Sequence, residues 1–173
     1  MLPRCSSVPE PAAWRHGSVA KSAASPYLSR SALVVRLLGM KRIQNAPWAW
    51  LVGIVIAHLA VSLIHGAAHA QAKVPMSPAA NLFVFGVILA GPLIGLALAL
   101  RSRRVGAWII GIAMAASLVF GVANHFVLAS ADHVAHIAPR WQPLFVATAV
   151  LLAITEALGS GLAVQIIRER SLT

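Results

Sequence analysis

The feature that most constrains this chain is a set of four apolar segments, each about 20 residues or longer. They cover residues 47–66, 79–100, 105–129 and 142–167. At a rise of about 1.5 Å per residue, a helix of roughly 20 residues crosses a hydrocarbon core about 30 Å thick. Backbone polar groups find no water in that core, so a spanning segment must bond internally. The sequence therefore predicts an all-α membrane protein, an antiparallel bundle of four transmembrane helices with the lipid bilayer as its surroundings.

Composition supports a membrane protein and argues against other classes. Hydrophobic residues make up 59% of the 173 residues and charged residues only 10%, too few to cover the surface of a soluble domain. The net charge of +10 could suggest nucleic acid, but the basic residues flank the apolar segments, where they act as topology signals. We therefore expect no nucleic-acid binding. The single cysteine, Cys5, excludes an internal disulfide and a thiolate metal site.

The positions of the basic residues predict the orientation. Basic residues precede the first segment (41–42), join the second to the third (101–104) and follow the fourth (168–170). The other two connections contain only Lys73 and Arg140. Because cytoplasmic loops carry the excess of Lys and Arg, we expect both termini to be cytoplasmic. The compact loops favour a multi-pass protein of the bacterial cytoplasmic (inner) membrane.

Residues 1–39 differ in character from the rest and predict a disordered basic tail, followed by a transmembrane domain over 40–173. The tail is rich in Ser, Ala and Arg and has no persistent helical stripe. One interpretation is an organellar transit peptide. The favoured one is an over-long gene start, because Met40, Lys41 and Arg42 directly before an apolar run are typical of a membrane-protein start.

The first apolar segment has a competing interpretation as a cleaved signal peptide. A basic start, an apolar run and the A-x-A pattern at 68–70 resemble such a leader. The run is longer than the usual apolar region of about 7–15 residues, and His58 interrupts it. A membrane-spanning helix is therefore the preferred interpretation.

Two local patterns refine the second segment. Ser77 and Pro78 predict an N-cap and a first-turn proline. Gly91 and Gly95 form a G-x-x-x-G pair that lets a neighbouring helix approach closely. Pro92 lacks an N–H and so frees the carbonyl of Ile88, which needs another partner.

Histidines are the most informative polar residues, because ionisable groups in membranes are costly and tend to face the bundle interior. The first segment carries His58, Ser62, His65 and His69 at offsets of 4, 7 and 11. At about 100° per residue these side chains share one helical face. His65 and His69 are an i, i+4 pair that can chelate one ion on a continuous helix. Gly66 between them could end the helix early.

The end of the third segment adds a second group of histidines. His125 lies about 20 residues into a helix that runs from inside to outside, a depth similar to that of His65. His133 and His136 follow in the outer loop. Asp132 is a candidate to bind the ion or orient an imidazole, and Asn124 is a candidate supporting residue. The sequence predicts a metal site from His65, His69, His125, His133 and His136.

Glu156 is the only acid within an apolar segment. It lies about 10 residues from the inner end of the fourth segment, and His58 lies at a similar depth in the first. Pairing would reduce the cost of burying both groups, so a buried Glu156–His58 pair is predicted. Ser62, Thr155 or a backbone carbonyl are the alternative partners.

These residues lead to several functional hypotheses. The first is a divalent transition-metal site (Zn, Fe or Cu) at the outer membrane face, serving redox chemistry or metal handling. A b-type haem held by His65 and His125 is the alternative cofactor. An accessory subunit, or a proton or metal transporter component, needs no stable cofactor. Enzymatic activity is left open, and a homo-oligomer or a larger membrane complex is a possible assembly.

Overall fold

The computed structural model describes the backbone of residues 26–169 and the side chains of residues 46–169. The chain divides into two units, Met1–Leu38 and Gly39–Thr173, each of which is described by itself. The first helix, α1 (Pro26–Ala72), begins well before the predicted start near residue 47. Residues 26–39, predicted as part of a disordered tail, are therefore helical. A proline at the first helical position, followed by Leu, Ala and Arg, is compatible with that conformation.

The rest of the prediction for the tail lies outside the described residues, which begin at Pro26. A translation start at Met40, a transit peptide and cleavage after the first segment all remain predictions. The helical start at Pro26 bears on none of them, because each concerns how the chain is made and processed.

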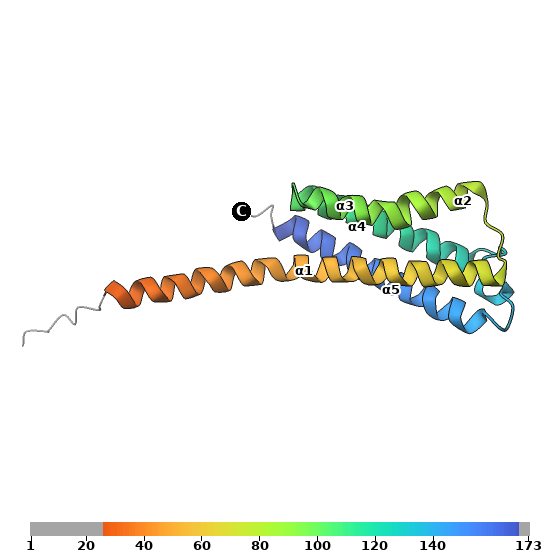
Figure 1. Cartoon of the computed structure of the whole chain (residues 1–173), viewed down its shortest axis with the longest axis horizontal. Helices are drawn as coiled ribbons and strands as arrows, with labels where there is room; N and C mark the ends of the chain where they lie inside the picture. The colour runs from red at the N-terminus through yellow and green to blue at the C-terminus, as the bar shows by residue number, and fades with distance from the viewer. Residues whose placement is uncertain (1–25, 170–173) are drawn as a thin grey trace, which may run out of the picture. The chain divides into compact units, whose positions relative to one another are not determined.

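In the described part of the chain all regular secondary structure is helical, with no strand (Figure 1). After α1 come α2 (Pro78–Phe83), the π-helical η1 (Val84–Ala90) and α3 (Gly91–Ala99), which together form one continuous span. The next span consists of α4 (Arg103–Val122) and the π-helical η2 (Ala123–Val127). A loop with the short 3₁₀ helix η3 (Val134–His136) leads to α5 (Gln142–Glu169).

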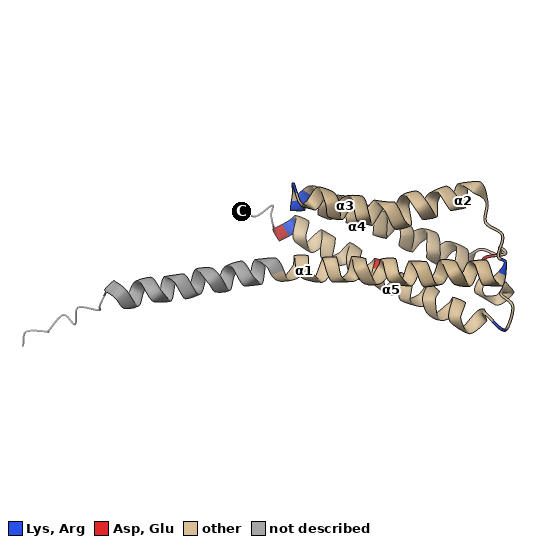
Figure 2. Cartoon of the chain, in the orientation of Figure 1, with Lys and Arg blue, Asp and Glu red and all other residues tan. Residues whose placement is uncertain are grey.

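Four helical stretches are long and apolar enough to cross a membrane, as predicted. They are Ala46–Ala72, Pro78–Ala99, Arg103–Val127 and Gln142–Glu169. Figure 2 shows Lys and Arg concentrated near the ends of these helices, with long uncharged stretches between them. Many large hydrophobic side chains point outward, among them Leu82, Leu100 and Val119. Outward-facing apolar side chains are suited to the hydrocarbon core of a lipid bilayer.

Helix boundaries follow from local chemistry. The Ser77 side chain accepts a hydrogen bond from the Ala80 N–H at 3.1 Å, and Pro78 occupies the first turn, as predicted. Ser102 caps α4 by accepting from the Val105 N–H at 3.4 Å. Lys73 ends α1 with a positive φ of 53°.

Small residues bring α3 and α4 into close contact. A Cβ added to Gly91 would lie 2.8 Å from Cβ of Ala113. One added to Gly95 would lie 2.5 Å from Ile110, and one added to Gly106 would lie 2.4 Å from Cβ of Ala99. The predicted G-x-x-x-G pair therefore packs against the next span, where the missing side chains leave room for its backbone.

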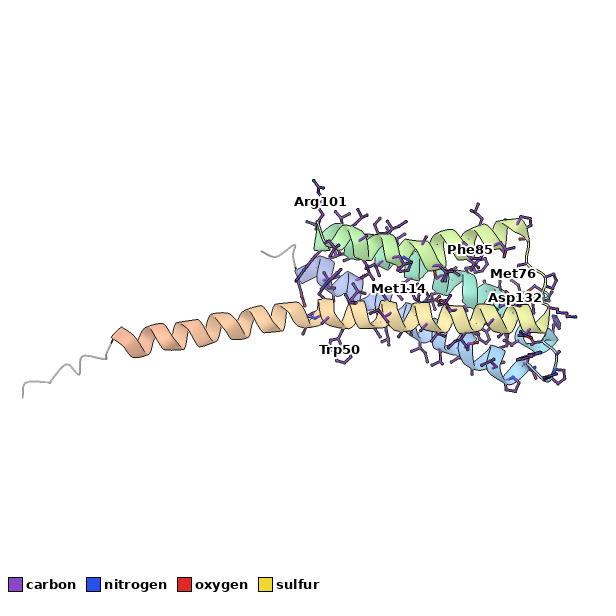
Figure 3. All side chains as sticks on the ribbon, in the orientation of Figure 1. Trp50, Met76, Phe85, Arg101, Met114 and Asp132 are labelled. Atoms are coloured by element: carbon purple, nitrogen blue, oxygen red, sulfur yellow. The ribbon has the colours of Figure 1, made fainter. Side chains whose placement is uncertain are left out.

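Arg101 and Asp132 lie at opposite ends of the Gly39–Thr173 unit (Figure 3). We call these the arginine end (residues 100–104) and the loop end (residues 73–77 and 128–141). An apolar core at the arginine side joins α1, α4 and α5; its buried members are Leu51, Val55, Ala107, Ile110, Met114, Ala163 and Ile166. A smaller core of Ala68, Ile137 and Phe145 lies at the loop end, packed against Val74 and Trp141.

Candidate metal centre

Three imidazoles meet in the interior near the loop end. His65 and His69 come from α1 and His125 comes from η2, and one ring nitrogen of each lies within 4.8 Å of the others. The ring centroids of His65 and His69 are 4.8 Å apart, and those of His65 and His125 are 4.9 Å apart. The three side chains are only 6–8% exposed. We call this group the histidine triad; such a group could hold a metal ion.

Helix geometry explains why these side chains converge. α1 continues through Gly66 to Ala72, so His65 and His69 stay one turn apart on the same face. His125 lies in the π-helical η2 at the end of its span. A π-helical turn holds one more residue than an α-helical turn and so changes the direction of the side chains that follow.

His65 is held by a threonine from α5. Its Nδ1 lies 2.8 Å from Oγ1 of Thr148. The Thr148 hydroxyl donates its own proton to the backbone carbonyl of Leu144 at 2.8 Å, so it must accept from His65. The proton of neutral His65 is therefore on Nδ1, and Nε2 carries a lone pair.

His125 is oriented in the same way by Asp132. Its Nδ1 lies 3.2 Å from the backbone oxygen of Asp132 and 3.3 Å from the carboxylate Oδ1. Both oxygens are acceptors, so Nδ1 carries the proton and Nε2 of neutral His125 has the lone pair. That Nε2 lies 3.2 Å from Nε2 of His65, and two lone pairs therefore face one another.

His69 completes the group. Its Nε2 lies 3.1 Å from Oδ1 of Asp132, a close contact without hydrogen-bond geometry, and both its Nδ1 and that Oδ1 are buried without a hydrogen-bond partner. Burial alone would raise the pKa of Asp132, but the contact with His125 and the nearby His69 and His65 lower it below its usual value. Asp132 is therefore an anion whose Oδ1 lies within 3.3 Å of one nitrogen of each of two imidazoles, and a carboxylate is common behind metal-binding histidines.

Phe145 packs against all three imidazoles. The centroid of its ring lies 4.7 Å from that of His65, 4.8 Å from that of His69 and 5.3 Å from that of His125. The Phe145 side chain is fully buried. It restricts rotation of the rings and closes one side of the histidine triad.

The predicted pair of His58 and Glu156 lies deeper. His58 Nδ1 and Glu156 Oε1 are 3.8 Å apart, too far for a hydrogen bond, and both side chains are buried. His58 Nε2 instead contacts the Ile88 carbonyl at 3.2 Å. That is the carbonyl that Pro92 was predicted to free, and a histidine from another helix satisfies it.

The remaining predicted residues do not join the histidine triad. His133 accepts a hydrogen bond from the Ala135 N–H on Nδ1 at 3.1 Å and so caps η3. His136 is exposed, and its Nδ1 contacts the Ser130 carbonyl at 2.6 Å. The Asn124 amide donates to the Phe120 carbonyl of its own helix at 2.8 Å. These three side chains therefore serve the fold of the loop and the helix end.

Sequence reasoning missed Thr148 and Phe145. Thr148, Leu152 and Glu156 are spaced by four residues, so Thr148 lies on the helix face that carries Glu156. That spacing could have identified Thr148 as a partner for a histidine of the first span. Nothing in the sequence distinguishes Phe145 from the other apolar residues of α5.

A cavity of about 520 Å³ extends from the histidine triad into the bundle. His65, His69, His125 and Asp132 line it at the loop end, and Ser62, Ser117 and Glu156 line it further in. Most of the remaining lining is apolar, including Ile88, Phe120 and Leu152. An ion on the triad would thus have an accessible space beside it.

No protein-family model, curated protein or solved structure matches this chain. What the site does is therefore inferred from its own geometry and chemistry.

Proposed function

We propose that this membrane protein binds one divalent transition-metal ion through Nε2 of His65, Nδ1 of His69 and Nε2 of His125. The observation that carries the proposal is that each imidazole has one nitrogen facing an acceptor and the other left free. One ring nitrogen of each of these three buried imidazoles lies within 4.8 Å of the other two. Three neutral ligands with a carboxylate behind them suit a divalent cation.

The spacing of the nitrogens supports a single ion. Tetrahedral coordination with metal–nitrogen bonds of about 2.0–2.1 Å places two ligand atoms roughly 3.3–3.4 Å apart. The Nε2 atoms of His65 and His125 are 3.2 Å apart. Two facing lone pairs at this distance repel, and a cation between them would remove that repulsion.

The same geometry favours an ion over b-type haem. Two axial imidazoles bind haem iron from opposite faces, which places their nitrogens about 4 Å apart, twice a bond of about 2.0 Å. The His65 and His125 nitrogens are closer than this, and Phe145 packs against both rings. Three protein ligands with an accessible fourth position are typical of Zn²⁺, with Cu²⁺ and Fe²⁺ as alternatives.

We further propose that the four spans form an antiparallel bundle with both termini cytoplasmic, in the bacterial inner membrane. The arginine end then faces the cytoplasm and the loop end faces outward, which follows from the distribution of basic residues. Cysteines introduced at Arg101 and Arg140 should react with an impermeant thiol reagent from opposite sides of intact membranes. Labelling of both from one side would refute this topology.

A resident ion is a better interpretation than a transported one. Between Glu156 and the arginine end, α1, α4 and α5 pack an apolar core in which Leu51, Val55, Ile110 and Met114 are fully buried. Among the described residues, the buried members of that core are all apolar and offer no side-chain ligand to a hydrated cation. The ion therefore serves the loop end and the cavity beside it.

Metal analysis of the purified full-length protein tests the proposal. We expect one equivalent of metal and no haem Soret band, with loss of the metal in His65→Ala and His125→Ala. His136→Ala is the matched control and should retain it. A protein without metal after reconstitution would refute the proposal and favour an accessory role, in which His65 and His125 share a proton.

A further inference from the structure

The cavity beside the histidine triad is lined by the triad, by Glu156 and by many apolar side chains. Glu156 is the acid among the lining residues further in. Its Oε1 lies 3.8 Å from Nδ1 of His58, too far for a hydrogen bond to that ring. A buried carboxyl without such a bond is costly in a membrane, so its position beside the cavity needs an explanation.

Gly121 lies close to both His125 and Glu156. A Cβ added there would lie 3.9 Å from Cδ2 of His125 and 4.0 Å from Oε2 of Glu156. The imidazole and the carboxyl therefore face the same small gap, which a side chain at this position would fill. A molecule bound to the ion would therefore enter a space that Glu156 also lines.

The cavity reaches the lipid-facing surface. Leu63, Phe85 and Val122 line it and are 68%, 64% and 38% exposed. They belong to three different spans, so the opening lies within the membrane-spanning part of the unit. Figure 3 places Phe85 between the loop end, marked by Met76 and Asp132, and the arginine end. A ligand with an acyl chain could enter from the bilayer.

We propose that the cavity binds the carbonyl end of an acyl ester from the bilayer, and that the protein hydrolyses it. The inference rests on the proposed metal site. An ion held by the histidine triad would supply a bound water; Glu156, in its ionised form, would take a proton from that water as its oxygen bonds to the carbonyl carbon. The bond from that carbon to the alkoxy oxygen breaks, and the leaving alcohol takes the proton back from Glu156. The products are a carboxylic acid and an alcohol, and water is the only co-reactant.

Several features of the site match these roles. Three imidazoles leave a fourth coordination position for water, as in zinc hydrolases. The ion polarises the carbonyl and lowers the pKa of bound water. The apolar lining by Ile88, Phe120 and Leu152 suits an acyl chain. Hydrolysis also needs no electron donor, which a redox reaction at the same ion would need.

The test uses full-length protein reconstituted with Zn²⁺ in detergent and p-nitrophenyl octanoate as the probe. We expect metal-dependent release of p-nitrophenol by the wild type. Glu156→Gln should keep one equivalent of metal and lower kcat by about 10²–10⁴-fold, the usual contribution of an acid–base group. A wild type that binds metal and does not hydrolyse the ester, or a Glu156→Gln variant with unchanged kcat, would overturn this inference and leave the metal site standing.

A second pair of variants covers the case in which Glu156→Gln fails to fold. Gly121→Leu places a side chain in the gap between the ion and Glu156, so it should retain metal and lose hydrolysis of the octanoyl ester. Gly161→Leu is the control, because a Cβ there meets nothing within 4 Å. Equal hydrolysis by both glycine variants would overturn the proposed place of reaction. Loss of metal from the wild type would instead refute the proposed function on which the inference rests.

Discussion

Thr148→Val tests whether the histidine triad is oriented from behind. Valine has nearly the shape of threonine but cannot accept the proton of His65 Nδ1, which the hydroxyl now does at 2.8 Å. His65 then has no acceptor in that direction, and its ring can rotate or take the other tautomer. Either change moves the Nε2 lone pair away from the position shared with His125.

The expected loss of metal affinity follows from the general effect of removing a hydrogen-bond partner behind a metal-bound histidine. Replacing an outer partner of a metal-bound histidine costs about 10–100-fold in affinity. At about 1.4 kcal/mol per tenfold, this equals roughly 1.4–2.8 kcal/mol of binding free energy. A hydrogen bond between helices in a membrane contributes on average only about 0.6 kcal/mol to the free energy of unfolding. We therefore expect a large effect on the metal Kd and a small effect on the stability of the metal-free protein.

Thr155→Val is the matched control. Thr155 is also a buried threonine of α5, and its hydroxyl donates to the Leu152 carbonyl of the same helix at 2.9 Å. Both variants lose a bond within α5, but only Thr148→Val loses the contact with His65. The difference between the two therefore isolates the effect of that contact.

The assay is competition for Zn²⁺ with a chelator of known affinity, in parallel with unfolding in detergent. The Kd of Thr148→Val should exceed that of Thr155→Val by about 10–100-fold. Wild-type affinity in both variants would show that the hydroxyl does not orient His65. An equal loss in both variants would assign the effect to α5 itself.

The remaining predictions use the same measurements. Asp132→Asn should raise the metal Kd by about 10–100-fold, because the amide cannot hold two imidazoles as an anion does; an unchanged Kd would contradict its role. His133→Ala should alter neither metal content nor Kd, since its ring caps η3. Loss of metal from this variant would show that His133 is also a metal ligand. Gly106→Ala should lower the free energy of unfolding by about 1–3 kcal/mol, because the added Cβ would lie 2.6 Å from the carbonyl oxygen of Gly95. Gly161→Ala meets no atom within 4 Å and should be neutral or stabilising, by up to about 1 kcal/mol; equal destabilisation of the two would argue against close packing of α3 on α4.

The spans could be predicted from the sequence because they depend on a local property. Apolar length fixes which stretches can cross a membrane, and a predicted span such as 79–100 differs little from the observed Pro78–Ala99. Caps such as Ser77 are equally local, since the capping oxygen accepts a hydrogen bond from an N–H only three residues further along the chain. The start of α1 at Pro26 was not predicted, because the basic composition there resembles that of a disordered tail.

The candidate site was only partly predictable. Helical periodicity placed His65 and His69 on one face, and matching depth brought His125 toward them. Depth alone could not separate His125 from His133 and His136, because a loop can turn a side chain inward or use it as a cap. All three were therefore predicted as ligands, and only His125 joins the histidine triad among the described residues.

The sequence by itself determined that this chain forms membrane-spanning helices and carries a polar stripe from His58 to His69 along the first of them. Both follow from apolar length and a period of about 3.6 residues, which act over one or two turns. Only the tertiary structure decided that Thr148, 83 residues from His65, holds one imidazole and that Asp132 holds two others. These contacts depend on the rotation of each helix about its axis and on the path of the loop before α5. Packing of the whole bundle sets both.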